Sequence, residues 1–157
     1  MADTILPTSV AEAVAILASG GLVALPTETV YGLGARADDS RALARIFEAK
    51  GRPADNPLIA HVASIEQVGD VVLSIAPYAR DLMERFWPGP LTLVLPVRED
   101  MPSQLTAGLQ TVGVRMPDHA LTRAVMKALG VPVAAPSANR SGRPSPTTWE
   151  AVREDLE

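Results

Sequence analysis

Apolar residues recur every three to four positions in some stretches of the sequence and form short unbroken runs in others, the patterns of amphipathic helices and buried strands. Thr8 and Ser9 open the first helical stretch, Ser9 and Glu12 have the spacing of a capping box, and Gly20-Gly21 stops it. The same patterns predict helices over residues 40–50, 77–86 and 120–129 and from Thr148 on, and strands over 22–25, 58–62, 91–95, 111–115 and 131–135.

Short apolar strands that alternate with amphipathic helices are typical of an α/β fold, in which helices pack on a sheet. The sequence has no internal repeat or low-complexity linker, so residues 1–157 are predicted to form a single domain. Polar or glycine-bearing segments lie after Leu25, before Leu58 and after Ala135. Because ligands of open α/β sheets bind near strand ends, we expect these three segments to form the walls of one site.

Composition and charge narrow the class of protein further. The chain has no run of about 18 apolar residues and no signal-like leader at Met1-Ala2-Asp3-Thr4, so no membrane contact is expected. It has no cysteine, which excludes disulfides, thiol catalysis and thiolate metal sites, and we expect a cytoplasmic protein. The net charge of −4 argues against a protein that coats nucleic acid through its overall field.

Lys50-Gly51-Arg52-Pro53, at the end of the predicted helix 40–50, is a first candidate binding motif. Two cations on either side of a glycine could face one polyanion while the backbone approaches it closely. Lys50 could instead complement the helix dipole as a simple C-terminal cap. The local pattern alone favours the cap.

Residues 136–142, directly after a buried strand, are a second candidate. Ser137 and Asn139 supply a hydroxyl and an amide that suit phosphate, ribose or base edges, and Arg140 or Arg143 adds charge. The alternative is an ordinary surface loop, because serine, asparagine and glycine are common loop residues. Taken alone, this motif favours the loop.

Residues 26–33, which follow the first predicted strand, are a third candidate. The hydroxyls of Thr29 and Tyr31 fall on the same side if the backbone is extended, and could line a pocket for a small polar molecule. Tyr31 could instead be a core aromatic residue with a satisfied hydroxyl.

The two histidines do not indicate a metal site. His61 lies inside an apolar strand, where a lone histidine is more often a hydrogen-bonded core residue than a base or ligand. His119 falls in a predicted loop, and no carboxylate has the spacing that a zinc site would need. Walker A, Rossmann and nucleophile-elbow motifs do not occur in the sequence. No single motif therefore identifies the function.

Five motifs nevertheless occur together in a fixed order. They are Leu25-Pro-Thr-Glu-Thr-Val-Tyr-Gly-Leu33, Lys50-Gly-Arg-Pro53 with Asn56-Pro57-Leu58, Trp87-Pro-Gly-Pro-Leu-Thr92, Val114-Arg-Met-Pro117 and Ala135-Pro-Ser-Ala-Asn139. With this set the chain closely resembles the YrdC/TsaC family of threonylcarbamoyl-AMP synthases, from about Ser9 to Trp149. The resemblance implies a twisted, open mixed α/β sheet flanked by helices, with a positively charged concave face.

The resemblance also implies roles for individual residues. The family signature, Lys-x-Arg followed much later by Ser-x-Asn, falls on Lys50, Arg52, Ser137 and Asn139. These residues are expected to bind the nucleotide, with Lys50 and Arg52 as the catalytic pair. The nucleotide side also includes Asn56, Thr111 and Ser145, and the threonine side consists of Thr29, Tyr31, His61, Arg115 and Ala135. Arg115 is expected to pair with the threonine carboxylate.

The implied reaction joins ATP, L-threonine and bicarbonate into threonylcarbamoyl-AMP and releases pyrophosphate, which makes the protein a nucleotidyltransferase. The product would pass to the tRNA threonylcarbamoyl-transferase machinery, as the first step of threonylcarbamoyladenosine formation in tRNA. Mg²⁺, held mainly through the ATP phosphates, is the implied cofactor, with no metal site built from protein ligands. Contact with tRNA or double-stranded RNA is a further expectation.

Family domains continue beyond the Ser-x-Asn loop with more strands and a Ser-Thr-Val segment, so the resemblance implies a catalytic domain that residues 1–157 leave incomplete at the C-terminal side. An RNA-binding module of the same fold without synthase activity is an alternative, although an aromatic content of 4% offers few stacking platforms. A related domain that adenylates carbamate for metallocentre assembly is a second alternative. The absence of cysteine counts against it.

Overall fold

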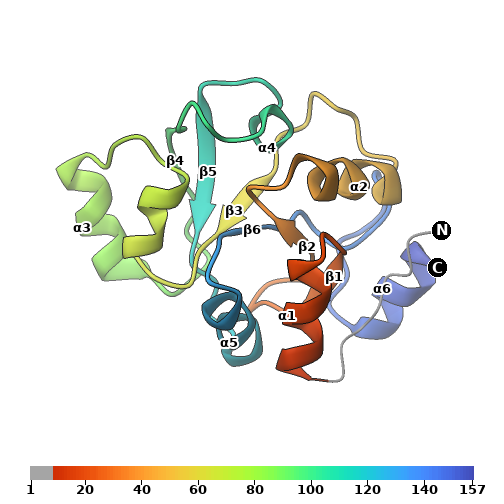
Figure 1. Cartoon of the computed structure of the whole chain (residues 1–157). Coiled ribbons are helices and arrows are strands. Elements are labelled where there is room, and N and C mark those ends of the chain that lie inside the picture. The colour runs from red at the N-terminus through yellow and green to blue at the C-terminus, as the bar shows by residue number, and fades with distance from the viewer. Residues whose placement is uncertain (1–8) are drawn as a thin grey trace.

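Six short strands form one sheet that crosses the molecule (Figure 1). The computed structural model of the protein describes residues 9–157. The strands are β1 (Val23–Leu25), β2 (Gly32–Arg36), β3 (Ile59–His61), β4 (Leu93–Pro96), β5 (Thr111–Arg115) and β6 (Val133–Ala134), in the spatial order β1-β2-β6-β3-β5-β4. Only β3 and β5 pair in parallel among these described neighbours, and the other pairs are antiparallel. This mixed, open sheet confirms the expected fold class.

The helices begin and end at the residue types that favour such boundaries. They are α1 (Val10–Ala18), α2 (Ser40–Lys50), α3 (Pro77–Phe86), α4 (Ser103–Thr106), α5 (Ala120–Leu129) and α6 (Trp149–Leu156), with a 3-10 helix η1 (Glu66–Asp70). The Ser9 hydroxyl accepts the Glu12 N–H at 3.1 Å, and Asp39 caps α2 in the same way. Gly51, at a φ of 58°, closes α2. Thr8 lies outside the described residues. Within residues 9–157, no helix is long and apolar enough to span a membrane.

The bounds of α2, α3, α5 and β5 agree with the sequence prediction, whereas β2, η1 and α4 were not predicted. In β2, Gly32 and Gly34 weaken the strand signal, because glycine has no side chain to pack and gains little in a sheet. Gly34 serves close packing instead. A Cβ at this position would lie 3.1 Å from side-chain atoms of both Leu25 and Val133.

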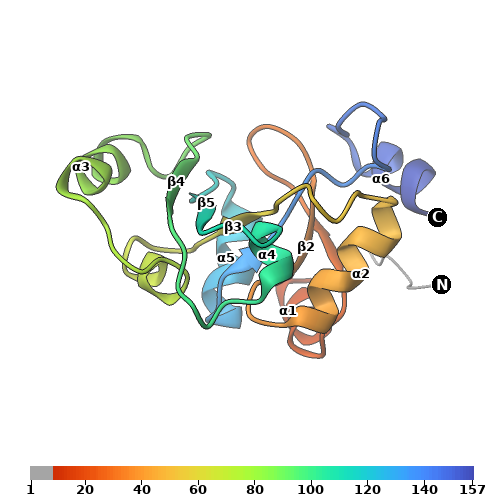
Figure 2. The same ribbon diagram turned by 90° about the horizontal axis from the view of Figure 1, so that it is seen from above.

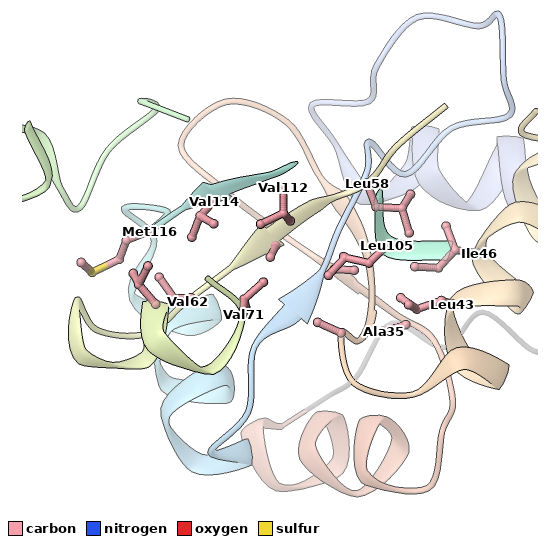
Figure 3. Close-up of a cluster of buried hydrophobic side chains, with 14 of the residues drawn as sticks. Ala35, Leu43, Ile46, Leu58, Val62, Val71, Leu105, Val112, Val114 and Met116 are labelled. Carbon is pink, nitrogen blue, oxygen red and sulfur yellow. The ribbon is translucent and has the colours of Figure 1, made fainter. Parts of the chain in front are cut away.

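The core consists of two clusters, one on each face of the sheet, because successive strand residues point to opposite faces. In the smaller cluster, α1 and α5 pack against Val23, Leu25 and Val133, and these two helices lie side by side in Figure 1. The larger cluster fills the other face and joins α2 to β5 and η1. Figure 3 shows its members Ala35, Leu43, Ile46, Leu58, Val62, Val71, Leu105, Val112, Val114 and Met116.

Helices leave part of the sheet uncovered on the face opposite the larger cluster. The residues of β3, β4 and β5 that point there include Ile59, Val94, Thr111, Gly113 and Arg115, which we call the open face, together with His61 and Pro96. Gly113 pairs with both Ile59 and Val94 across the strands, and these two neighbours are 36% and 66% exposed. Arg115, at the carboxyl end of β5, lies at one end of the open face.

Candidate functional site

Lys50, the last residue of α2, joins two of the segments that were predicted to share a site. Its Nζ donates hydrogen bonds to the backbone carbonyls of Ser137 and Asn139, and its own carbonyl accepts the Ser141 N–H at 2.9 Å. Lys50 is 2% exposed. The interpretation of Lys50 as a simple helix cap is therefore wrong. Gly51 closes the helix, and the ammonium group binds the loop after β6.

The environment of Lys50 lowers the pKa of its ammonium group. Burial, followed by the positive charge of Arg52, lowers the pKa of Lys50 to about 8, and the carboxylate of Asp155 partly offsets this effect. At pH 7 the group is still mostly protonated. A buried ammonium group therefore lies under the backbone of the Ser137–Asn139 loop.

Arg52 lies next to Lys50 and organises the segment that follows it. Its Nε donates to the Asn56 carbonyl at 3.1 Å and its Nη2 to the Pro57 carbonyl at 2.8 Å. The Asn56 N–H donates to the Pro53 carbonyl at 3.1 Å, which closes a turn. The side chain of Asn56 is exposed beside this turn. Burial lowers the pKa of Arg52, whose Nη1 has no hydrogen-bond partner within residues 9–157.

Asn139 is fixed at one end of its amide and unpaired at the other. Its Nδ2 donates to the carbonyls of Arg140 and Arg143, both at 2.8 Å, and the residue is 5% exposed. The surface-loop interpretation is therefore wrong for this residue. Its Oδ1 is buried without a hydrogen-bond partner among the described residues. A buried acceptor of this kind costs free energy, so Oδ1 marks a place that suits a donor from a ligand.

Arg115 is the centre of a second group of polar side chains. Its Nη2 donates to Glu28 Oε1 at 2.5 Å and to the Thr29 hydroxyl at 3.1 Å, while its Nε is buried without a partner among the described residues. Residues 28–30 form a bend, so the extended backbone assumed for Thr29 and Tyr31 does not occur. Thr29 reaches Arg115 through this bend.

His61 is the cross-strand partner of Arg115, in register on the parallel strands β3 and β5. It is 4% exposed, and its Nδ1 lies 3.0 Å from the Ile59 carbonyl. Burial lowers the pKa of His61 to about 4, so the ring is neutral at pH 7. The prediction of a hydrogen-bonded core histidine is confirmed.

Tyr31 connects the two groups through its backbone. Its N–H donates to the Pro146 carbonyl at 2.9 Å, and its carbonyl accepts the Ala138 N–H at 2.8 Å. Figure 2 shows the loop between β1 and β2 beside the loop before α6. Tyr31 is partly buried and packs against the larger core cluster, which agrees with part of the core interpretation, but its hydroxyl makes no hydrogen bond to a described residue.

Three residues assigned by resemblance make no side-chain hydrogen bond to a described residue. Ala135 follows β6 directly and donates its N–H to the Ile59 carbonyl at 3.1 Å. Ser145 is exposed, in the loop segment before Pro146. Thr111 is also exposed and lies at the opposite end of β5 from Arg115. Thr111 was predicted for the nucleotide side, and its separation from Arg115 does not bear on that prediction.

Two carboxylates were not predicted as site residues. Glu28 pairs with Arg115, and Asp155 of α6 pairs with Arg143 at 2.5 Å and accepts from Arg140 Nε through its carbonyl at 3.0 Å. Glu28 had a recognisable signal, as a carboxylate beside Thr29 in the polar segment after β1. Asp155 had none, because its partners depend on how α6 folds back.

Two hollows on the surface of the described residues do not coincide with these groups. One of about 590 Å³ is lined by Gly69, Val72, Leu73, Ser74, Ile75, Arg80, Arg98, Glu99 and Asp100. Another of about 510 Å³ shares Leu73, Arg98 and Glu99 with it. Neither contains a residue that the sequence assigned to the site. The chemistry of the side chains, rather than enclosed volume, locates the candidate site.

The described side chains also bear on the implied Mg²⁺. Within residues 9–157, no three His, Asp or Glu side chains are grouped so that they could hold a metal ion. The groups around Lys50 are the Arg52 guanidinium, the Asn139 amide and the single carboxylate of Asp155, which do not form a carboxylate cage. They fit an ion that arrives with phosphate oxygens and keeps most of its water.

A mixed open α/β sheet flanked by helices, with polar groups gathered near the ends of β5, β6 and α2, has the architecture of α/β domains in which ligands bind near strand ends. The chain belongs to the Sua5/YciO/YrdC family, whose model, described as "Telomere recombination", matches residues 15–157.

Named relatives share this sequence closely. A threonylcarbamoyl-AMP synthase of Bacillus subtilis is 54% identical, covering 94% of this chain and 43% of the relative. One of Pyrococcus abyssi is 57% identical, covering 92% of this chain and 42% of the relative. The crystal structure of P. abyssi Sua5 complexed with L-threonine superposes with a TM-score of 0.91 at 55% identity, over 93% of this chain and 43% of that one. The chain thus spans less than half the length of these relatives.

Proposed function

We propose that this chain carries the synthase site of a threonylcarbamoyl-AMP synthase, which forms threonylcarbamoyl-AMP and pyrophosphate from ATP, L-threonine and bicarbonate. The observation that carries the proposal is the contact of Lys50 with the Ser137 and Asn139 carbonyls. It unites the two halves of the family's Lys-x-Arg and Ser-x-Asn signature. The close relatives named as synthases, and the threonine complex of P. abyssi Sua5, support the same activity.

In this proposal the two groups of side chains hold different reactants. Arg52 and the Ser137–Asn139 loop bind the nucleotide, and Mg²⁺ bound to the phosphates reduces their negative charge. Lys50 shapes the loop through its two carbonyl contacts and adds positive charge beneath it. Arg115 binds the threonine carboxylate, because a guanidinium group suits this anion.

The chemistry needs no nucleophile from the protein. The threonine amine attacks the carbon of bicarbonate or CO₂ to give a carbamate, with loss of water or a proton. A carbamate oxygen then attacks the α-phosphorus and the bond to pyrophosphate breaks. Rate acceleration would come from holding three reactants together and from balancing charge on the phosphates. The product would serve the enzymes that modify tRNA.

The alternatives are less well supported. The relatives described above are named as synthases, which does not favour an RNA-binding module without activity. An RNA contact in addition to synthesis remains a separate proposal.

Pyrophosphate release tests the proposed activity directly. With ATP and Mg²⁺, we expect release only when both L-threonine and bicarbonate are present. Arg52→Ala should lower kcat/KM by about 100-fold, because it removes charge that the phosphates need. Arg98→Ala is a matched control, since Arg98 pairs with Asp100 outside both groups. Release that is independent of threonine, or an Arg52→Ala variant that behaves like the control, would contradict the proposal.

A further inference from the structure

Both carboxylate oxygens of Glu28, a loop residue, accept hydrogen bonds from other parts of the chain. Its Oε1 lies 2.5 Å from Arg115 Nη2, and its Oε2 accepts the Asp118 N–H at 2.9 Å. Both oxygens are therefore used, and they bind two different parts of the chain. Glu28 thereby connects the loop after β1 to the carboxyl end of β5 and to the segment between β5 and α5.

The contacts fix one part of the Arg115 guanidinium and leave another part free. Nη2 has two hydrogens, and both are directed to Glu28 and the Thr29 hydroxyl. Nε is buried without a partner, and Nη1 has no hydrogen bond to any described residue. The side chains of Arg115 and Glu28 are 12% and 22% exposed, so neither moves freely in water.

The network around Glu28 favours a fixed carboxylate over a displaceable one. Burial would raise the pKa of Glu28, but hydrogen bonds from its own amide, from Arg115 and from Asp118 lower it below the ordinary value. Moving Glu28 away would leave the Asp118 N–H and a largely buried guanidinium group without their acceptor. A ligand carboxylate can therefore reach Arg115 most easily at Nη1, without replacing Glu28.

We infer that Glu28 is a positioning residue for amino-acid recognition, which holds Arg115 so that Nη1 is presented to the carboxylate of the substrate. The inference rests on the proposed function, in which that substrate is L-threonine. Glu28 itself does not touch the substrate. It acts through the orientation of the guanidinium group.

The test is the affinity of the chain for L-threonine and, separately, for ATP with Mg²⁺, measured by calorimetry. Glu28→Gln keeps the size of the side chain but can satisfy only one of the two donors, so Arg115 loses its fixed orientation. We expect threonine binding to weaken by about 10-fold or more, with ATP affinity unchanged. Asp100→Asn is the matched control, because Asp100 pairs with Arg98 by a similar contact away from this group.

Each outcome has a defined meaning. Threonine affinity in Glu28→Gln that equals or exceeds that of the unchanged chain overturns the inference, and tighter binding would mean that Glu28 competes with the substrate. If Glu28→Gln does not fold, Glu28→Asp, whose carboxylate is shorter by one methylene, is judged by the same two affinities. An unchanged chain that binds ATP but no threonine overturns the proposed function together with the inference.

Discussion

At the scale of single residues, the site depends on ionisable groups that are buried and yet hydrogen-bonded. His61 is buried, its Nδ1 lies 3.0 Å from the Ile59 carbonyl oxygen, and it is the cross-strand partner of Arg115. Its neutral ring suits a place beside a cation, since a second positive charge would repel Arg115. Because the buried ring stays neutral, the free energy of unfolding should depend on pH.

The folded protein should lose stability between pH 6.5 and 4 because of His61. The pKa of His61 is about 4 in the folded state, whereas an exposed histidine has its ordinary value of 6.5. The unfolded chain therefore binds more protons in this window, and the free energy of unfolding falls by at most about 1.4 kcal/mol per pH unit. Urea unfolding at several pH values checks this, with His61→Gln as the comparison. An equally steep loss in His61→Gln would assign the effect to other groups.

Several residues of the two polar groups could be named from the sequence, but their partners, Glu28 and Asp155 among them, could not. The motifs pointed to Lys50, Arg115 and Asn139, and each is part of a polar group in the structure. The hydrogen-bond partners depend on tertiary contacts, such as that between Lys50 and Asn139, which are 89 positions apart in the sequence. A local pattern contains no such information, and for Lys50 it favoured the wrong interpretation.

At the scale of elements, sequence periodicity predicted the bounds of helices better than the bounds of strands. α3 and α5 have an apolar stripe and a clear start or stop, so their bounds could be predicted. β2 could not, because its burial comes from neighbours on both faces and its sequence, Gly-Leu-Gly-Ala-Arg, lacks the usual strand formers. β2 therefore forms because of its tertiary packing and not because of the strand propensity of its residues.

β2 should tolerate no larger residue at Gly34. Gly34→Val would push branched carbon atoms towards Leu25, Val133 and the Val23 carbonyl, all within 3.2 Å of the position of Cβ. We expect the free energy of unfolding to fall by about 1–3 kcal/mol, measured by urea denaturation. Gly69→Ala is the control, because a Cβ there meets nothing within 4 Å. A fully stable Gly34→Val variant would show that β1 and β6 can move apart.

At the scale of the whole molecule, the two core clusters share one sheet and should not unfold separately. Leu17 is completely buried in the smaller cluster, and Trp87 belongs to the larger one. Each cluster is too small to offset the entropy of ordering its half of the chain alone. The sheet makes them one cooperative unit.

Leu17→Ala should therefore destabilise the entire chain. We expect the free energy of unfolding to fall by about 2–5 kcal/mol, with the same shift in tryptophan fluorescence and in circular dichroism. Leu109→Ala, at a position that is 56% exposed, should change little. If fluorescence and circular dichroism gave different midpoints in Leu17→Ala, the two clusters would be separate folding units.

The place of β6 in the sheet has a consequence for the order in which the sheet can assemble during translation. β6 is the last of the six described strands in sequence, yet it lies between β2 and β3. Until it is translated, the β1-β2 ribbon and the β3-β5-β4 sheet are separate pieces with unpaired edges, which are prone to stick to other chains. Residues 133–134 join them, and the Ser137–Asn139 loop follows directly. The nascent chain thus gains its central strand and the Ser137–Asn139 loop almost together, and a chain interrupted before this point has neither.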